Sequence, residues 1–446
     1  MRAGPRPPLT LEPEELRRLG HRVVDAIADH WERLDEGPPI QAGDPGELRA
    51  LVGGPPPDAP GDVDAALDTL LQHVVPLIQR GDHPRFFARV GSPSNPVGAL
   101  ADALGAGFNV FAGSWAGGSG PTAVELTVLD WLRSWCGMPE GTSGILVSGG
   151  SVASLTGLAA AREARPGRRV CVVSDQTHAS ILRGIRLLGL EQRMVPTGPD
   201  LRMDPAALSL TDDDLCVVAT AGTTNVGAVD PLDAIADACD ERGVWLHVDA
   251  AYGGPTVLTE RGRALLGGLG RADSLVVDPH KMLFQPLEAG CVLVRHPGAL
   301  ERTFEMFPEY LRDTFGSDDR VNLRERGPQL SRGSRALKLW LSLHAFGLDA
   351  FRAAIDRVQD LAERAQRAVE ATDNLEVVTP AQLGIVTFAP REGDAGALND
   401  RVTADGFAAP SSTVLRGRTV LRLCTINPRT TDDDIDRTVE RISQLA

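Results

Sequence analysis

The segments VWLHVDAAYGG (residues 244–254) and SLVVDPHK (residues 274–281) give the strongest indication of the fold. Both segments open with an apolar run, and the helical pattern of Arg261–Leu266 lies between them. Continuously apolar strands joined through a helix are typical of a parallel sheet that is covered on both faces. The first strand ends in Asp249, and Lys281 closely follows the second.

The same alternation of strands and helices extends in both directions, from about residue 141 to residue 295. The expected strands are Ile145–Val147, Arg169–Ser174, Leu215–Thr220, Val244–Val248, Ser274–Val277 and Cys291–Arg295. The expected helices are Val152–Arg165, Ser180–Leu188, Pro231–Arg242 and Arg261–Leu266. These segments predict an α/β fold with a mainly parallel central sheet.

Helical segments and a second small domain flank this sheet. Near the N-terminus, the expected helices Leu16–Leu34 and Val63–Ile78 enclose a Pro- and Gly-rich segment, 37–60, and have few partners of their own. Two helices follow the sheet, around Ala336–Phe346 and Ala350–Ala371. The C-terminal strands are expected at Leu375–Val378, Ile385–Phe388 and Val420–Ile426, with helices near Ala395–Asp405 and Thr431–Leu445. We therefore expect an N-terminal helical segment (1–80), a large α/β domain (81–340) and a small α+β domain (341–446).

The composition excludes several classes of partner. Of the 446 residues, 45 are Lys or Arg and 60 are Asp or Glu, which gives a formal net charge of −15. Nucleic acids and anionic membranes bind through positive charge, so neither is an expected partner. No apolar run approaches the ~18 residues of a membrane span, and residues 1–10 lack a signal peptide's apolar core. The six cysteines form no CxxC pair, which favours reduced core thiols over disulfides or a metal site. We expect a cytoplasmic protein.

Only two of the basic residues are lysines, Lys281 and Lys338. Chemistry that needs a primary amine on a side chain therefore has two candidates. Lys338 lies in SRALKLWL (residues 334–341), a helical pattern in which we expect a solvated or snorkelling side chain. Lys281 ends a buried strand, where we expect desolvation to lower the pKa of the amine and make it a nucleophile toward carbonyls.

Ligands of a parallel sheet bind beyond the carboxyl ends of its strands, so the residues after each strand are candidates for a site. Gly150 and Ser151 follow the first strand and open a helix, which either binds an anion at its N-terminus or begins with a common cap. His178 follows the second strand, either as a ring-stacking and proton-transferring group or as a hydrogen-bonded loop residue. Thr224 follows the third strand, where it either contacts a ligand through its hydroxyl group or is part of a turn.

Asp249 and Lys281 lie at the same edge of the predicted sheet. A desolvated carboxylate needs a cation or hydrogen-bond donors, so Asp249 serves either a ligand's positive charge or the cap of a following helix. All these sites together fit pyridoxal phosphate, with the phosphate at Gly150 and Ser151 and the aldehyde at Lys281. The ring would lie beside His178, and Asp249 would keep the pyridine nitrogen protonated, so that the ring accepts electrons. The sequence contains no GxGxxG or GxxxxGK[ST] motif in favour of a nucleotide.

The chain resembles the group II pyridoxal-phosphate-dependent amino-acid decarboxylases, the aromatic-L-amino-acid decarboxylase family, over nearly its whole length. The most specific segments are HVDAAY (residues 247–252) and PHK (residues 279–281). Further matches are RRLGHRVVD (17–25), HPRFF (83–87), GSW (113–115), GS (150–151) and DQTH (175–178). The resemblance implies fold type I of the pyridoxal-phosphate-dependent transferases and the cofactor pyridoxal 5′-phosphate. It also implies an intertwined homodimer, with active sites at the interface and N-terminal helices that wrap the partner.

The same resemblance implies a role for each matching residue. Lys281 resembles the lysine that binds the cofactor's aldehyde, and Asp249 resembles the partner of the pyridine nitrogen. His178 resembles the histidine that stacks on the ring and helps in protonation, and Ala251 the residue on the opposite ring face. Further cofactor contacts implied by the resemblance are Gly150, Ser151, Thr224 and His280. The candidate substrate residues are Arg89, Ser92, Phe111 and, from the C-terminal domain, Arg429.

The chain departs from the family in the loop that normally carries a tyrosine, the proton donor to the carbon that loses CO2. Counting back from RALK (residues 335–338), this position falls near NLR (residues 322–324), which holds no tyrosine. Either Tyr310 serves from a shifted loop, or another donor such as His178 acts, or protonation is not the fate of this carbon. Family members without the tyrosine can let oxygen react instead, giving an aldehyde, ammonia and peroxide.

The expected substrate pocket differs as well. Positions that are aromatic in family members are Arg89, Val90, Gly113 and Leu287 here, which does not favour a standard aromatic substrate. Arg89 either meets an acidic side chain of the substrate or is a structural surface arginine. The asparagine expected two residues before His280 is Asp278, which should not contact a phosphate unless it is protonated or turned away.

We therefore expect a pyridoxal-phosphate-dependent carboxy-lyase that converts an L-amino acid into the amine and CO2. The alternatives on the same scaffold are oxidative deamination to an aldehyde and transamination. A cofactor-free homologue is disfavoured because Lys281, Asp249 and His178 are all present.

Overall fold

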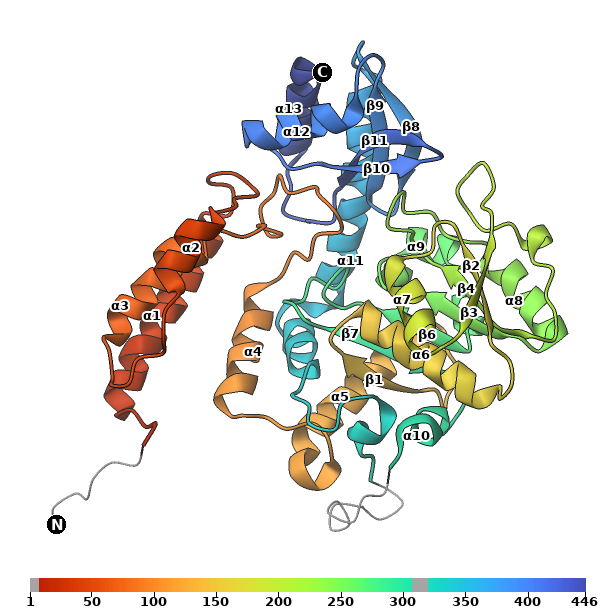
Figure 1. Cartoon of the computed structure of the whole chain (residues 1–446), viewed down its shortest axis with the longest axis horizontal. Helices are drawn as coiled ribbons and strands as arrows, with labels where there is room; N and C mark the ends of the chain where they lie inside the picture. The colour runs from red at the N-terminus through yellow and green to blue at the C-terminus, as the bar shows by residue number, and fades with distance from the viewer. Residues whose placement is uncertain (1–7, 307–319) are drawn as a thin grey trace.

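The structure is a computed structural model that describes residues 8–306 and 320–446 (Figure 1). A seven-stranded sheet lies at its centre, in the order β1-β7-β6-β5-β4-β2-β3. Its strands are β1 (Ser143–Val147), β2 (Val170–Ser174), β3 (Glu191–Val195), β4 (Asp214–Thr220), β5 (Trp245–Asp249), β6 (Ser274–Val277) and β7 (Gly290–Val294). Strand β7 pairs antiparallel with β1 and β6, and the other pairs are parallel. The predicted α/β fold with a mainly parallel sheet is confirmed.

The central sheet separates two apolar cores, because alternate side chains of a strand point to opposite faces. Val172 belongs to one core and its neighbour Val173 to the other. Helices α6 and α7 pack in the core around Val173, and α5 and α8 pack in the core around Val172. The helices of this part are α4 (Pro96–Gly107), α5 (Trp115–Trp135), α6 (Gly150–Ala164), α7 (Ala179–Leu187), α8 (Leu232–Arg242), α9 (Glu260–Leu265) and α10 (Ala299–Phe304).

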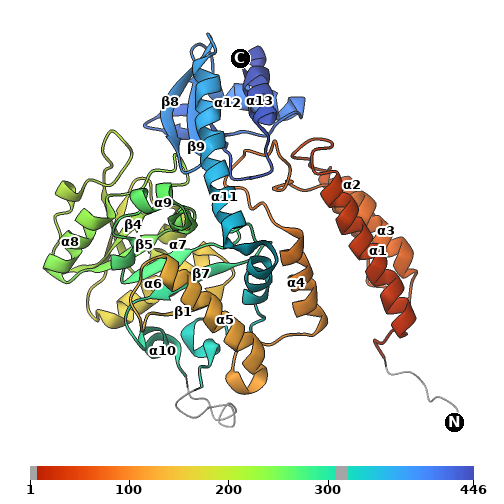
Figure 2. The same ribbon diagram turned by 180° about the vertical axis from the view of Figure 1, so that it is seen from behind.

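A second sheet lies in the C-terminal part and is antiparallel throughout, in the order β10-β11-β9-β8. Its strands are β8 (Leu375–Gln382), β9 (Ile385–Pro390), β10 (Ser411–Leu415) and β11 (Arg418–Cys424). Strands β8, β9 and β11 form a core with α12 (Ala395–Asp405) and α13 (Asp432–Leu445). The long helix α11 (Ala336–Glu370) runs from the central sheet to this second sheet (Figures 1 and 2). It is interrupted at Gly347, between the two helices predicted there. The division of the chain at residues 80 and 340 stays a prediction.

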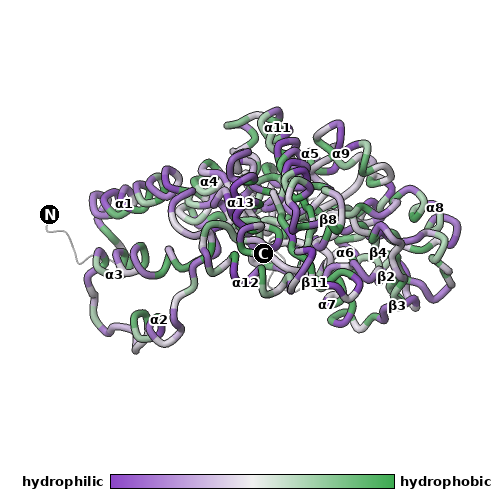
Figure 3. The backbone as a smooth tube through the Cα atoms, turned by 90° about the horizontal axis from the view of Figure 1, so that it is seen from above, coloured by the Kyte–Doolittle hydropathy of each residue, from purple (hydrophilic) through white to green (hydrophobic). Residues whose placement is uncertain are grey.

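The N-terminal helices stand to one side of the rest of the molecule (Figures 1 and 2), and the view from above shows the same separation (Figure 3). They are α1 (Pro13–Glu32), α2 (Pro45–Val52), α3 (Val63–Thr69) and a π-helical turn at Leu70–Val74, and none of them contains a buried residue. Helix α2 lies in the Pro- and Gly-rich segment 37–60, where no helix was predicted. It forms because Asp44 accepts from the N–H groups of Gly46 and Glu47, and Pro45 fits the first turn.

The expectation of a solvated or snorkelling Lys338 is wrong. Its side chain is buried, and its Nζ lies 2.7 Å from Asp102 Oδ2. The same nitrogen donates to the carbonyl oxygens of Pro286 (3.1 Å) and Glu288 (3.3 Å). Lys338 therefore supports the segment that follows Lys281, and an ion pair stabilises its charge in the interior.

The six cysteines are all buried and free, in agreement with the prediction of core thiols. Within residues 8–306 and 320–446, no helix combines the length and the apolar character that a bilayer crossing requires.

Candidate active site

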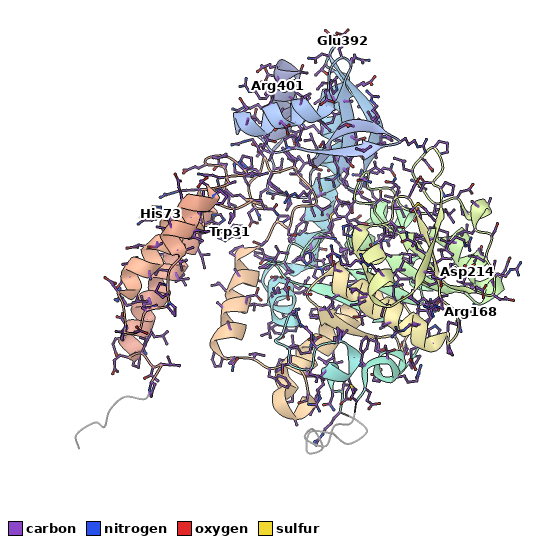
Figure 4. The ribbon with its side chains drawn as sticks, viewed as in Figure 1. Trp31, His73, Arg168, Asp214, Glu392 and Arg401 are labelled. Carbon is purple, nitrogen blue, oxygen red and sulfur yellow. The ribbon has the colours of Figure 1, made fainter. Side chains whose placement is uncertain are left out.

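A single cavity of about 420 Å³ lies beyond the carboxyl ends of β1, β2, β4, β5 and β6. Arg168 and Asp214, labelled in Figure 4, mark the opposite edge, because Asp214 is the first residue of β4. The cavity brings together every residue that the sequence suggested for cofactor binding: Gly150, Ser151, His178, Thr224, Asp249, Ala251, His280 and Lys281. The amine and the carboxylate on which the sequence argument depends thus face one space.

The turn between β1 and α6 forms one wall of the cavity and leaves no room for side chains. A Cβ atom on Gly150 would lie 2.9 Å from Asp278 Oδ2, and one on Gly149 would lie 3.2 Å from the ring of His280. Behind the turn, a Cβ on Gly290 would lie 2.4 Å from the Cα of Gly149. Val152 and Ala153 donate the first hydrogen bonds of α6, both to the carbonyl oxygen of Gly149, so the N–H groups of Gly150 and Ser151 precede them and are presented to the cavity with the positive end of a helix dipole.

Asp249 is the last residue of β5 and is buried. Its Oδ1 accepts a hydrogen bond from the N–H of Ala251, at 3.1 Å. Burial raises the pKa of Asp249, while the positive charge of Lys281 acts in the opposite direction. The carboxyl group is thus prepared for a cationic N–H group of a ligand, which would hold it in the charged form.

Lys281 follows β6, and its Nζ lies 3.0 Å from Asp278 Oδ2. Burial lowers the pKa of the amine, but the negative charges of Asp278 and Asp249 outweigh this effect and hold the pKa above its ordinary value. The expectation that desolvation makes Lys281 a free amine is therefore wrong for the protein without a ligand. Asp278, on the same loop, was not predicted as a direct partner of this amine.

His280 points its ring at the same carboxylate. Its Nδ1 accepts from the N–H of Ala289 (3.2 Å), so the neutral ring carries its proton on Nε2, which lies 3.7 Å from Asp278 Oδ2. Burial lowers the pKa of His280 and keeps the ring neutral. Asp278 itself is 1% exposed and is not turned away from the cavity, whose wall it forms beside Gly150.

His178 lies at the rim of the cavity and caps α7. Its Nδ1 accepts from the N–H of Ser180 (3.3 Å) and lies 2.8 Å from the hydroxyl oxygen of the same residue. The neutral ring therefore carries its proton on Nε2. His178 is thus a hydrogen-bonded loop residue that also lines the cavity, and its role in ring stacking and proton transfer stays a prediction.

The predicted substrate residues are divided between the cavity and other places. Arg89 lines the cavity, and its Nη1 also donates to Gln79 Oε1 at 2.7 Å. Ser92, Phe111 and Arg429 are not among the residues that line it. Arg429 forms an ion pair with Asp82, 2.7 Å between Nη2 and Oδ1. Their roles stay predictions.

Glu288 and Tyr252 line the cavity without having been singled out from the sequence. Glu288 comes from the loop after Lys281, where its carbonyl accepts from Lys338 and its carboxylate from Arg335, 2.9 Å away. This loop has no regular pattern, so its sequence signals were its closeness to Lys281 and the neighbouring pocket position Leu287.

These residues fit pyridoxal phosphate. The cavity offers a primary amine, a buried carboxyl group for a ring nitrogen and a glycine turn with unpaired N–H groups for a phosphate. In addition, Asp278 Oδ1 is buried and has no hydrogen-bond partner among the described residues, as expected of an atom that awaits a polar ligand.

Comparison with known proteins gives a consistent picture. The family model of the pyridoxal-dependent decarboxylase conserved domain matches residues 45–391. An aromatic-L-amino-acid decarboxylase from Bacillus atrophaeus is 42% identical over 98% of this chain and 97% of its own length. A phenylacetaldehyde synthase from a Rosa hybrid cultivar is 29% identical over 95% of this chain and 92% of its own. The crystal structure of Oryza sativa TDC with PLP and tryptamine matches with a TM-score of 0.91 and 28% identity, over 99% of each chain.

Proposed function

Because the chain belongs to the pyridoxal-dependent decarboxylase family, we propose that its substrate is an aromatic L-amino acid. The reaction class follows from membership of this family. The protein is a pyridoxal-phosphate-dependent carboxy-lyase that converts an L-amino acid into the amine and CO2. The observation that carries the aromatic substrate is the 42% identity to an aromatic-L-amino-acid decarboxylase over 98% of this chain. Similarity of this extent outweighs the interpretation of Arg89 and Val90 given above.

When bound, pyridoxal phosphate supplies an aldehyde for an amine and a ring that withdraws the electron pair left by CO2. Lys281 would supply the amine that holds the cofactor's aldehyde. Asp249 holds a proton at the pyridine nitrogen, and its burial strengthens this interaction. The α6 N-terminus with Gly150 and Ser151 binds the phosphate, supported by Thr224 and His280.

His178 is proposed to stack on the ring and to move a proton at the substrate carbon. Its Nδ1 is fixed by Ser180, so Nε2 is the atom that exchanges the proton. Ala251 would lie against the opposite face of the ring. Tyr310, the other candidate donor, lies outside the described residues. Asn322 and Arg324 occupy the position counted from the family pattern, and both are buried.

We also propose a homodimer in the cytoplasm, with the N-terminal helices packed on the second copy. Helices α1–α3 contain no buried residue and carry exposed apolar side chains, among them Leu16, Val23 and Val24 on α1. A helix of this kind is stable only when its apolar face is covered. The substitution Val23→Asp should weaken the dimer, which light scattering would detect as a lower molar mass. Glu14→Asp, at an exposed polar position of the same helix, should leave the molar mass unchanged. A monomeric wild-type chain would contradict this proposal.

The substrate is tested with the full chain saturated with pyridoxal phosphate. L-tryptophan, L-tyrosine, L-phenylalanine and L-glutamate are supplied separately, and CO2, amine and peroxide are measured. We expect CO2 from an aromatic substrate with matching amine. Preferred turnover of L-glutamate, lost in Arg89→Gln, would contradict the aromatic proposal and assign Arg89 to an acidic side chain. Peroxide in proportion to CO2 would favour the aldehyde route instead.

A further inference from the structure

Asp278 is a buried carboxyl group in the wall of the proposed phosphate site. Its Oδ2 faces the turn at Gly150, where a Cβ atom would lie 2.9 Å away, and its Oδ1 is buried with no hydrogen-bond partner among the described residues. An ionised carboxylate in this place would face the phosphate as a like charge, and repulsion is strong where water is excluded. The group must therefore lose its charge before a phosphate can lie against it.

The nearest source of a proton is Lys281, whose Nζ lies 3.0 Å from Asp278 Oδ2. In the protein without a ligand, the two groups form an ammonium–carboxylate pair. Reaction with the cofactor's aldehyde needs the opposite state of Lys281, a neutral amine with a free electron pair. A single proton transfer would turn Lys281 into a neutral amine and Asp278 into a neutral carboxyl group, the forms that binding of the cofactor requires.

We propose that Asp278 accepts a proton from Lys281 when pyridoxal phosphate is loaded, and then donates a hydrogen bond to the phosphate as a neutral carboxyl group. This inference rests on the proposed cofactor site. In the transfer, an Nζ–H bond of Lys281 breaks, its electron pair stays on nitrogen, and an O–H bond forms on Asp278. The net charge of the pair stays zero. The amine then condenses with the aldehyde, so that a C=N bond forms and one water leaves.

The other titratable groups around Asp278 do not compete for this role. His280, on the same loop, is 3.7 Å away, and burial lowers its pKa and keeps it neutral. Cys291 on β7 is buried, which raises the pKa of its thiol and keeps it neutral. Asp249 at the end of β5 is a second negative group near Lys281 and has its own N–H donor, from Ala251. Lys281 is thus the cation in direct contact with Asp278 within the described part of the chain.

The first test uses ligands that separate the phosphate from the aldehyde. The full chain, freed of cofactor, is titrated at pH 8 with pyridoxine 5′-phosphate and with pyridoxine, neither of which can react with Lys281. Asp278→Asn removes the charge and keeps the shape, so it should bind pyridoxine 5′-phosphate at least about tenfold more tightly than the wild type. Pyridoxine should bind equally to both. Asp249→Asn is the matched control, since it removes a charge from the same cavity away from the turn. It should leave the ratio of the two affinities unchanged.

The second test counts protons. Calorimetry of pyridoxal phosphate binding at pH 7, in buffers of different ionisation enthalpy, should show about one more proton retained per site in the wild type than in Asp278→Asn. Asp278→Ser, also without a proton-accepting carboxylate, should match Asp278→Asn. Equal proton counts with equal affinity ratios would overturn the role of Asp278. If neither the wild type nor the variants bind pyridoxine 5′-phosphate, the cofactor site itself is wrong, which is a different result.

Discussion

The fully buried ion pair between Glu125 and Arg332 allows a quantitative prediction. The two groups form two contacts, 2.7 Å from Nη2 to Oε1 and 3.0 Å from Nη1 to Oε2, and neither side chain is exposed. Arg332 also donates to the carbonyl oxygens of Ala112 and Leu146, and Glu125 accepts from the N–H of Leu146. The pair therefore ties the segment before α11 to β1, which leads into the glycine turn.

The substitution Glu125→Leu should leave the guanidinium of Arg332 buried without its counter-charge, at a cost of about 3–5 kcal/mol. The N–H of Leu146 would lose its acceptor as well, which adds ~1 kcal/mol or more. We therefore expect a loss of at least about 4 kcal/mol in the free energy of unfolding. The double variant Glu125→Leu/Arg332→Met removes both charges of this pair and should recover at least ~2 kcal/mol of this loss.

The assay is urea unfolding of the cofactor-free full chain, followed by tryptophan fluorescence. Asp349→Leu is the control, because Asp349 pairs with Arg352 at 2.7 Å on the exposed surface. Loss of this pair should change the free energy of unfolding by less than ~1 kcal/mol. The reasoning is refuted if Glu125→Leu costs no more than this control. It is also refuted if the double variant is as unstable as the sum of the two single ones.

Three further predictions concern the site and the core. Lys281→Ala should abolish the covalent adduct with pyridoxal phosphate that borohydride reduction and mass spectrometry detect, and an adduct retained at Lys338 would contradict the assignment. Asp249→Asn should lower kcat at least about a hundredfold, ~2.7 kcal/mol, if the protonated ring nitrogen is the main electron acceptor, and an unchanged kcat speaks against it. Burial lowers the pKa of His247 to about 4, so its neutral form stabilises the fold and this contribution is lost as the pH falls from about 6.5 toward 4. In unfolding experiments His247→Gln should reduce this acid sensitivity by up to ~1.4 kcal/mol per pH unit, and an unchanged pH profile would show that His247 titrates normally.

Much of the central sheet could be predicted because its strands are apolar and end in chemically distinctive residues. The six expected strands correspond to β1, β2, β4, β5, β6 and β7 within a few residues. Strand β3 was missed because its sequence, EQRMV, is mostly polar and exposed at the edge of the sheet. A buried strand is recognised in the sequence by its run of apolar residues, and an exposed edge strand lacks such a run.

The residues that line the site could be predicted from the sequence, but their charge states could not. The rule that ligands bind at the carboxyl ends of parallel strands was enough to bring Lys281 and Asp249 to one cavity. The state of Lys281 depends on a 3.0 Å contact with Asp278, which no pattern of spacing measures. Lys338 was misjudged for the same reason, since the acidic partner that makes its burial possible, Asp102, lies far away in the sequence.

The contact between Gly149 and Gly290 has a consequence for how such an enzyme can diversify. Backbone lies directly against backbone there, so a side chain at Gly290 would displace the turn that precedes α6. Inherited variation that alters substrate choice is therefore confined to other residues that line the cavity, among them Arg89 and Val90.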